Sequence, residues 1–402
     1  MGKLVVLVYS TYLFFSIILF SAKGSTIIAQ LLGMLSFGLF FADRLMFNKR
    51  FVFPMPVKIF GSFVIYILFW SLIQNNLGIE NSMARFFTTF QIFLLFFLGV
   101  NLNIEKSNLK YTLNSFHLGI IYVLYDIYKS GEYVNSLIGG SRVSGLLENP
   151  NILGGFLAMG MYIAFLQFFI YKKVLVKWFY VFLSLFYTIP VFLISGSKAA
   201  IMLAVVSILS FVFLFYKKLA LFKKAIFIPL FLFSFLTIFS LVRETSGVKR
   251  IILMANFLDK KSGKSTDHST KVRAGFMTEG IRLWSERPLF GWGIKQFREI
   301  NTVQKNYYPH NNYIVLLSNL GIIGFILYYS IHFVVIYKLY FIRMRLSKKE
   351  KEILLWLIFM IFPLFLQDFT KGTYWEKPYW IYMSIIIGVT FSYSSQRFKS
   401  LK

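Results

Sequence analysis

Four polar segments in an otherwise apolar chain combine a cationic side chain or a histidine with Gly, Asn or Pro. They are residues 139–151 with Arg142, Asn149 and Asn151, residues 195–200 with Lys198, residues 273–293 with Arg273 and Arg282, and residues 308–313 with His310 and Asn311. Guanidinium groups bind phosphate oxygens in pairs, and a departing diphosphate needs its charge stabilised. A histidine that titrates near neutrality suits deprotonation of a sugar hydroxyl. Together these residue types indicate glycosyl transfer from a lipid pyrophosphate donor.

Each of these signals also has an ordinary structural explanation. Arg142 and Lys198 could anchor lipid headgroups, and His310 could cap a helix. Asn149 is held out of helix by Pro150, which itself suits the first turn of a helix. The functional interpretation depends on all four segments lying on the same side of the membrane.

The composition requires that most of the chain lie in lipid. The chain has 402 residues, of which 57% are hydrophobic and only 15% charged, with a net charge of +27 and a mean hydropathy of +0.66. A soluble domain carries about 25% charged residues. So high a positive charge in so apolar a chain is typical of basic residues at membrane surfaces, and nucleic acid is disfavoured as a partner. Since the chain has no cysteine, disulfides, thiolate metal sites and a cysteine nucleophile are excluded.

Apolar runs of membrane-spanning length recur along the chain. We expect an all-α integral membrane protein, a single polytopic domain over residues 1–402, with about twelve transmembrane helices. The apolar start, residues 4–22, is interpreted as a retained first span because it is longer than the apolar part of a signal peptide. The expected spans are centred near residues 12, 33, 65, 94, 119, 161, 186, 207, 233, 326, 361 and 386.

Lysines and arginines concentrate in alternate connections, which indicates the orientation of the chain. The basic connections share the side of the N-terminus, so the positive-inside rule places both termini in the cytoplasm. Two longer connections, residues 129–151 and 244–312, then fall on the outer, extracytoplasmic face. The larger one is expected to carry short helices between spans 9 and 10. Long ordered loops in economical folds are more often functional than not.

The large outer loop contains a polar part and an amphipathic part. Residues 259–270 are polar and small, and we expect a linker there. Val272, Phe276, Ile281 and Trp284 then recur at roughly helical spacing up to Pro288, which predicts a helix lying in the membrane interface. The alternative is a lid that only plugs the bundle.

Several other chemistries lack their sequence signals. The chain has no Walker A run, no G-x-G-x-x-G run and no D-x-D pair for a nucleotide sugar. Ion-coupled transporters usually carry ionisable groups in mid-span. Here only His117 and His332 lie clearly inside spans, and both are interpreted as hydrogen-bonded packing residues in preference to proton relays.

The last polar segment has a specific pattern. His310-Asn311, nine residues, Gly321, two residues and Gly324 resemble the His-Asn-x9-Gly-x-x-Gly signature of the O-antigen ligase and polymerase family. Three further stretches agree with that family. Residues 288–293 resemble its Pro-x-x-Gly-x-Gly turn, and residues 142–151 resemble its Arg-x-x-Gly…Asn-Pro-Asn segment. Residues 195–200 resemble its Ser-Arg-x-Ala turn. The resemblance spans about residues 139–335, and the first four spans match only in hydropathy.

The resemblance implies a helical membrane glycosyltransferase of the GT-C type that uses no metal or other cofactor and inverts the anomeric carbon. It would transfer a glycan from undecaprenyl pyrophosphate to an acceptor sugar, on the outer face of the cytoplasmic (inner) membrane. His310 would orient or deprotonate the acceptor hydroxyl, and Arg273 would bind the pyrophosphate.

The resemblance also implies roles for the remaining polar residues. Lys198 stands where the family usually has arginine, and lysine offers a point charge in place of a fork. Arg142 would hold the donor phosphate or the growing chain. The further candidates for substrate binding are Arg282, Asn311 and Asn151.

Four functions remain open from the sequence. The leading hypothesis, favoured by the 142–151 segment, is a polymerase that joins lipid-linked repeat units into surface polysaccharide, either O-antigen or capsule. The alternatives are a ligase that transfers finished polymer to lipid A core, a flippase for lipid-linked oligosaccharides and a purely structural membrane protein. The expected partners are a lipid-linked glycan donor, a glycan or lipid-linked acceptor and the bilayer, with a chain-length regulator as a further candidate.

Overall fold

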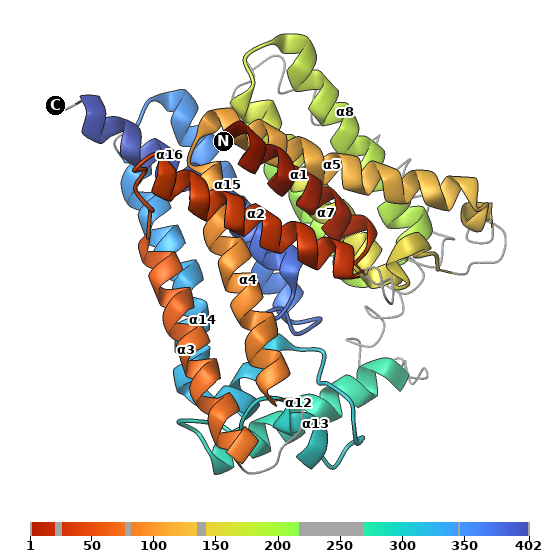
Figure 1. Ribbon diagram of the computed structural model, residues 1–402. Helices are drawn as coiled ribbons and strands as arrows, with labels where there is room; N and C mark the ends of the chain where they lie inside the picture. Colours follow the sequence, from red (N-terminus) through yellow and green to blue (C-terminus); the bar gives the residue numbers. More distant parts are fainter. Residues whose placement is uncertain are drawn as a thin grey trace.

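The structure is a computed structural model that describes residues 2–20, 26–76, 82–134, 142–216, 268–344 and 346–400 (Figure 1). The regular secondary structure in these ranges is helical. No strand occurs in these ranges, so the all-α expectation is confirmed for them. The long helices are α1 (Gly2–Ile18), α2 (Thr26–Met46), α3 (Met55–Asn76), α4 (Ser82–Asn103), α5 (Lys106–Lys129), α7 (Pro150–Ile170), α8 (Val174–Pro190), α9 (Lys198–Tyr216), α14 (Asn312–Arg343), α15 (Lys348–Asp368) and α16 (Lys377–Ser400). The remaining elements are α12 (His268–Glu286) and the short η1 (Gly145–Leu147), η2 (Val191–Ser195) and α13 (Gln296–Ile300).

The helices agree with most of the expected spans without confirming the number twelve. Every expected centre except one lies in a long helix, and the exception, near residue 233, is outside the described residues. Among the helices described, seven are long and apolar enough to cross a membrane: α2, α3, α4, α7, α8 continued by η2, α9 and α14. α15 falls short because residues 348–352 are all charged. The chain is thus a multi-pass membrane protein.

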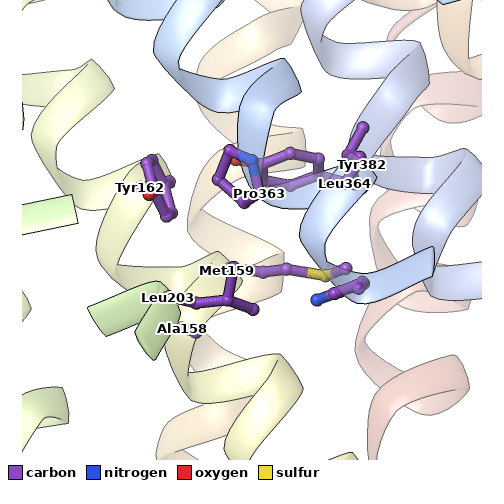
Figure 2. A pocket seen from close by; sticks show the side chains of 8 residues that line it. Ala158, Met159, Tyr162, Leu203, Pro363, Leu364 and Tyr382 are labelled. Carbon is purple, nitrogen blue, oxygen red and sulfur yellow. The ribbon is translucent and has the colours of Figure 1, made fainter. Parts of the chain in front are cut away.

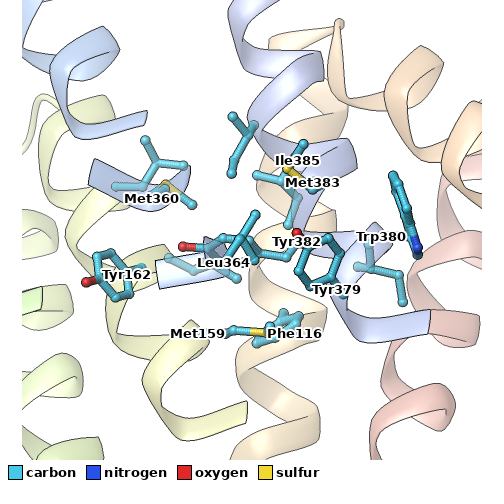
Figure 3. Packing of buried hydrophobic residues seen from close by; sticks show 14 of the residues in the cluster. Phe116, Met159, Tyr162, Met360, Leu364, Tyr379, Trp380, Tyr382, Met383 and Ile385 are labelled. Atoms are coloured by element: carbon cyan, nitrogen blue, oxygen red, sulfur yellow. The ribbon is translucent and has the colours of Figure 1, made fainter. Parts of the chain in front are cut away.

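α7 is the central helix of the bundle. Of its membrane-length window, 89% is buried inside the protein, against α5, α8, α9 and α15. Trp356 of α15 donates a hydrogen bond from Nε1 to the carbonyl of Tyr162 (3.0 Å). Figure 3 shows the neighbouring core, where Met159 and Tyr162 lie among side chains of α15 and α16. Because lipid is as apolar as the core, close packing and such hydrogen bonds hold these helices together.

The centre of the bundle is closely packed. A gap between α7, α9, α15 and α16 is lined by Ala158, Met159, Tyr162, Pro363 and Tyr382, among others (Figure 2). It is too small to admit a water molecule. A ligand would therefore have to bind elsewhere, which directs attention to the ends of the helices.

Both intramembrane histidines pair with neighbouring polar side chains, as predicted. His117 contacts the hydroxyl of Tyr187 through Nδ1 (3.0 Å) and Oε1 of Gln167 through Nε2 (2.7 Å). His332 contacts the hydroxyl of Tyr379 through Nε2 (2.6 Å). Both imidazoles are buried, so they pack the bundle from within.

Connections that were expected on the same face lie at the same end of the bundle. At one end, Oδ1 of Asn101 in α4 accepts from the backbone N–H of Val52, before α3 (2.9 Å). At the other end, the side chain of Gln74 in α3 pairs with the backbone of Ile294, in the outer loop (3.0 Å). α12 and α13 lie across this second end (Figure 1). The arrangement is consistent with the alternation of spans, while the assignment of the outer face stays a prediction.

Candidate functional site

α14 is interrupted at Gly321, and the turn 288–293 fills the interruption. Gly321 has φ 65° and ψ −170°, so the peptide groups around it lose their helical partners. Backbone groups of the turn replace those partners, as buried polar groups in a membrane protein require. The four bonds are Ile322 N to Pro288 O (2.9 Å), Ile323 N to Leu289 O (3.3 Å), Trp292 N to Ser318 O (3.0 Å) and Gly293 N to Asn319 O (2.7 Å).

Two of the motif glycines are explained by this backbone contact. A Cβ on Gly291 would lie 2.5 Å from the carbonyl carbon of Asn319, and one on Gly321 would lie 2.3 Å from the carbonyl oxygen of Leu289. Both glycines also have φ near +70°, a region that other residues enter only with strain. The Pro-x-x-Gly-x-Gly turn and the Gly-x-x-Gly helix are therefore two halves of one structural unit.

α3 supports this unit from the side. The hydroxyl of Tyr66 donates to the carbonyl of Leu320 (2.8 Å). The amide of Gln74 donates to the carbonyl of Ile294 and accepts from its N–H, both at 3.0 Å. Sequence reasoning missed both side chains because the first four spans matched the family only in hydropathy. A buried amide in an apolar span is the signal that could have found Gln74.

α12 lies against the beginning of α14. Phe276 and Leu283 pack with Phe297 and Ile314 in a small separate core. The contact is close at Gly280, where a Cβ would lie 2.1 Å from Cγ2 of Ile314. The predicted helix is confirmed, although Leu283 rather than Ile281 packs inward, and its place in the membrane interface stays a prediction. It already begins at His268, within the stretch expected to be a linker; residues 259–267 of that stretch lie outside the described residues.

The packing of α12 brings Arg273 near His310. His310 has φ 48°, a left-handed conformation that histidine tolerates better than most residues, and it reaches solvent. Asn311 caps α14 by accepting from the N–H of Ile314 (3.2 Å). Partial desolvation, and after it the charge of Arg273, lowers the pKa of His310 below its usual 6.5. These two predicted catalytic residues, 37 positions apart in sequence, therefore lie within electrostatic range of each other.

Arg282 is engaged in ion pairs on α12. Its Nε and Nη2 both donate to the carboxylate of Glu279 at 2.9 Å, and Nη1 pairs with Glu286. Glu279 also accepts from the N–H of Thr302 (3.0 Å), and these bonds, those from Arg282 first, lower the pKa of Glu279 to about 2. Arg282 thereby helps to hold the loop after α13 on α12. Its predicted contact with substrate would require it to exchange one of these partners.

The remaining predicted residues form a second cluster. Nε of Arg142 donates to the carbonyl of Ser195 (2.9 Å), and its Nη2 donates to Oδ1 of Asn151 (2.6 Å). Lys198 begins α9 three residues after Ser195. Asn149 caps α7 by accepting from the N–H of Asn151 (2.9 Å), as its place before Pro150 predicted. The first two polar segments thus form a single site.

The end of α15 lies between the two clusters. On the side of the Arg142 cluster, a Cβ on Gly155 in α7 would be 3.9 Å from Nε2 of Gln367, near the end of α15. On the side of His310, Thr373, just after α15, donates its N–H to Oδ1 of Asn312 (3.0 Å). Within the ranges that the structure describes, no direct contact joins Arg142 to His310. The structure therefore gathers the predicted residues at one end of the bundle as two neighbouring groups.

The fold and the site define a multi-pass helical membrane protein with a broken helix joined to the turn 288–293, and with Arg273 within electrostatic range of His310. Residues 182–329 match a family model described as O-antigen ligase, which confirms the resemblance to the O-antigen polymerase and ligase family. The match includes Lys198, Arg273, Arg282 and His310, whereas Arg142 and Asn151 lie outside it. No curated protein matches the chain.

Proposed function

We propose that the protein is a metal-independent, inverting glycosyltransferase that takes its glycan from undecaprenyl pyrophosphate. The proposal is carried by the turn 288–293 joined to the break in α14, together with the packing of α12 on α14 that leaves Arg273 within electrostatic range of His310. A base and a cation close together suit a reaction in which a hydroxyl is deprotonated while a diphosphate leaves. The joined turn and broken helix hold the backbone beside them in one geometry, as catalytic positioning requires.

The chemistry divides between the two residues. The acceptor oxygen forms a bond to the anomeric carbon, its proton passes to the imidazole of His310, and the carbon–oxygen bond to the diphosphate breaks. Arg273 would stabilise the charge on the departing diphosphate. The lowered pKa of His310 keeps its imidazole neutral, and so able to accept a proton, at pH 7. Arg142 and Lys198 would hold the donor further from the bond that breaks.

Two closely related activities are possible, and they differ in the acceptor that receives the glycan. We favour a polymerase that joins lipid-linked repeat units into surface polysaccharide, and the support is the hydrogen bonding of Arg142 to Asn151 and Ser195 in the 142–151 segment. The match to a family described as O-antigen ligase supports the alternative activity, which we expect to be transfer of finished polymer to lipid A core. In both cases the reaction would occur on the outer face of the cytoplasmic membrane, with both termini in the cytoplasm and a fold of the GT-C type.

A gel ladder of surface and lipid-linked polysaccharide distinguishes these activities. Cells that lack the protein would be complemented with the wild type or with His310→Ala. Loss of the ladder, with single repeat units still attached to the acceptor, is expected for a polymerase. Long polymer on the lipid carrier, with unmodified acceptor, would show a ligase. Full rescue by His310→Ala would contradict both and favour a flippase.

A further inference from the structure

Three cations and two aromatic rings form a cluster beside the loop of residues 301–311, which we call the His310 loop. None of the roles predicted above involves this cluster. Arg85 of α4 lies over the ring of Trp375 (5.0 Å from the centroid) and donates from Nη2 to the hydroxyl of Tyr308 (3.4 Å). Arg298 of α13 lies over the ring of Tyr308, also at 5.0 Å. The two rings are 5.3 Å apart. Lys295, just before α13, completes what we call the Arg85 cluster.

The Arg85 cluster has an excess of positive charge. Among the described residues, no carboxylate forms an ion pair with any of its three cations. All three are half-buried, and Nε of Arg85 is buried without an acceptor. Desolvation lowers the pKa of Lys295, and the nearby charges of Arg85 and Arg298 lower it further. The charge of Glu299 acts in the opposite direction and raises it. A bound anion would relieve both the repulsion and the unsatisfied donor.

Along the chain, the cluster lies close to His310. Tyr308 is two residues before His310, so their Cα atoms are at most about 7 Å apart. The charge of Arg273 contributes to the lowered pKa of His310. Arg273 is therefore the cation placed for the departing diphosphate. The cluster suits a charged group one or two sugar units away from the reacting hydroxyl.

The aromatic rings favour a glycan over a lipid headgroup as the ligand. Tyr308 and Trp375 are both half-buried, and such rings offer apolar edges and faces to a sugar ring. The four segments that build the cluster come from α4, α13, the His310 loop and the loop before α16.

We propose that Arg85, Lys295 and Arg298 form an acceptor subsite for an acidic sugar, one that carries a carboxylate or a phosphate, with Tyr308 and Trp375 framing its ring. The proposal rests on the glycosyltransferase function proposed above. It makes the enzyme selective for charged acceptors, and it assigns specificity to α4, which lies outside the residues that match the family.

Binding tests the subsite without turnover. The full chain in neutral detergent would be titrated with a trimer of galacturonic acid, and with a neutral galactose trimer, while tryptophan fluorescence is followed. We expect a change with the charged trimer only, abolished by Trp375→Phe. Arg85→Gln and Arg298→Gln should weaken binding at least about tenfold, and Arg85→Lys less. Lys305→Gln, an exposed cation of the same loop, is the matched control and should bind normally.

Three binding results would overturn the subsite: no fluorescence change with the charged trimer, an equal change with the neutral trimer, or unaltered binding in Arg85→Gln and Arg298→Gln. Loss of binding to phosphatidylglycerol vesicles in the same variants, with trimer binding intact, would show a headgroup site and also overturn it.

Kinetics with lipid-linked substrates extracted from cells that lack the protein give an independent readout. Arg85→Gln should raise the KM for acceptor about tenfold, with the KM for donor and kcat little changed. A raised KM for donor would assign the cluster to the donor diphosphate and overturn the proposal. If the wild type transfers no glycan, the proposed function fails, whereas the trimer titration still decides the subsite.

Discussion

At the scale of residues, the site depends on how charges are distributed around His310. Arg273 lies close enough to lower the pKa of His310, whereas Arg282 is compensated by Glu279 and Glu286. The two arginines, nine positions apart on α12, thus have different environments. This difference makes Arg273 the better candidate for the departing diphosphate.

The pH dependence of turnover tests the coupling between Arg273 and His310. Transfer requires a neutral imidazole, so kcat/KM should fall as the pH drops through the pKa of His310, which lies below 6.5. Arg273→Gln removes a positive charge, which raises this pKa, and the acid limb of the profile should move to higher pH. Turnover should also fall by about 10²- to 10³-fold. Lys305→Gln should leave the profile unchanged, and an unmoved limb in Arg273→Gln would refute the coupling.

The sequence predicted some of these residue environments and could have predicted others. Glu279 and Glu286 stand three residues before and four after Arg282, the spacing of ion pairs on a helix, so its pairing was readable. The contact of Arg85 with Tyr308 joins residues 223 positions apart, and no local pattern encodes it. Local chemistry can be predicted from sequence, whereas contacts between distant spans require the fold.

At the scale of elements, the break in α14 organises the site. Residues 312–343 read as one apolar run, and Gly321 is the local sign that the helix is interrupted. The turn 288–293, although it was recognised as a motif, gave no indication that it would supply the missing hydrogen bonds. The centres of the helices could be predicted because apolar length alone determines them, but their irregularities depend on partners distant in sequence.

Replacing Gly321 tests whether the break positions the site. Gly321→Ala would strain a left-handed residue and place a Cβ 2.3 Å from the carbonyl oxygen of Leu289. We expect a loss of about 1–3 kcal/mol of stability, visible as a lower Tm in detergent, together with reduced transfer. Gly38→Ala, in α2, has nothing within 4 Å of its Cβ and serves as the control, with an unchanged Tm. If Gly321→Ala and Gly38→Ala had the same Tm, the break in α14 would not be needed to hold the site in place.

At the scale of the whole molecule, the segments that carry the site converge on one end of the bundle. Gln74, Arg85 and Arg142 come from different helices or connections, and the alternation of spans places all of them on the predicted outer face. This convergence agrees with the distribution of basic residues, which predicts a cytoplasmic opposite end. The structure brings these segments to one end of the bundle, and which side of the membrane that end faces stays a prediction from the basic residues.

The absence of native cysteine makes this sidedness easy to measure. A cysteine at exposed Lys305, in the His310 loop, should react with a membrane-impermeant maleimide in intact spheroplasts. A cysteine at exposed Lys349, in the first turn of α15, should react only after permeabilisation. The reverse pattern would place the site in the cytoplasm and rule out transfer at the outer face.

The most direct test of the account is the turnover of purified His310→Ala with extracted lipid-linked glycan. Loss of the general base should reduce glycan transfer by about 10²- to 10⁴-fold, while the Tm and the retention of lipid-linked donor stay those of the wild type. Lys305→Gln, at a neighbouring exposed loop residue, should transfer normally. Transfer by His310→Ala at the wild-type rate would contradict the central claim that this histidine activates the acceptor.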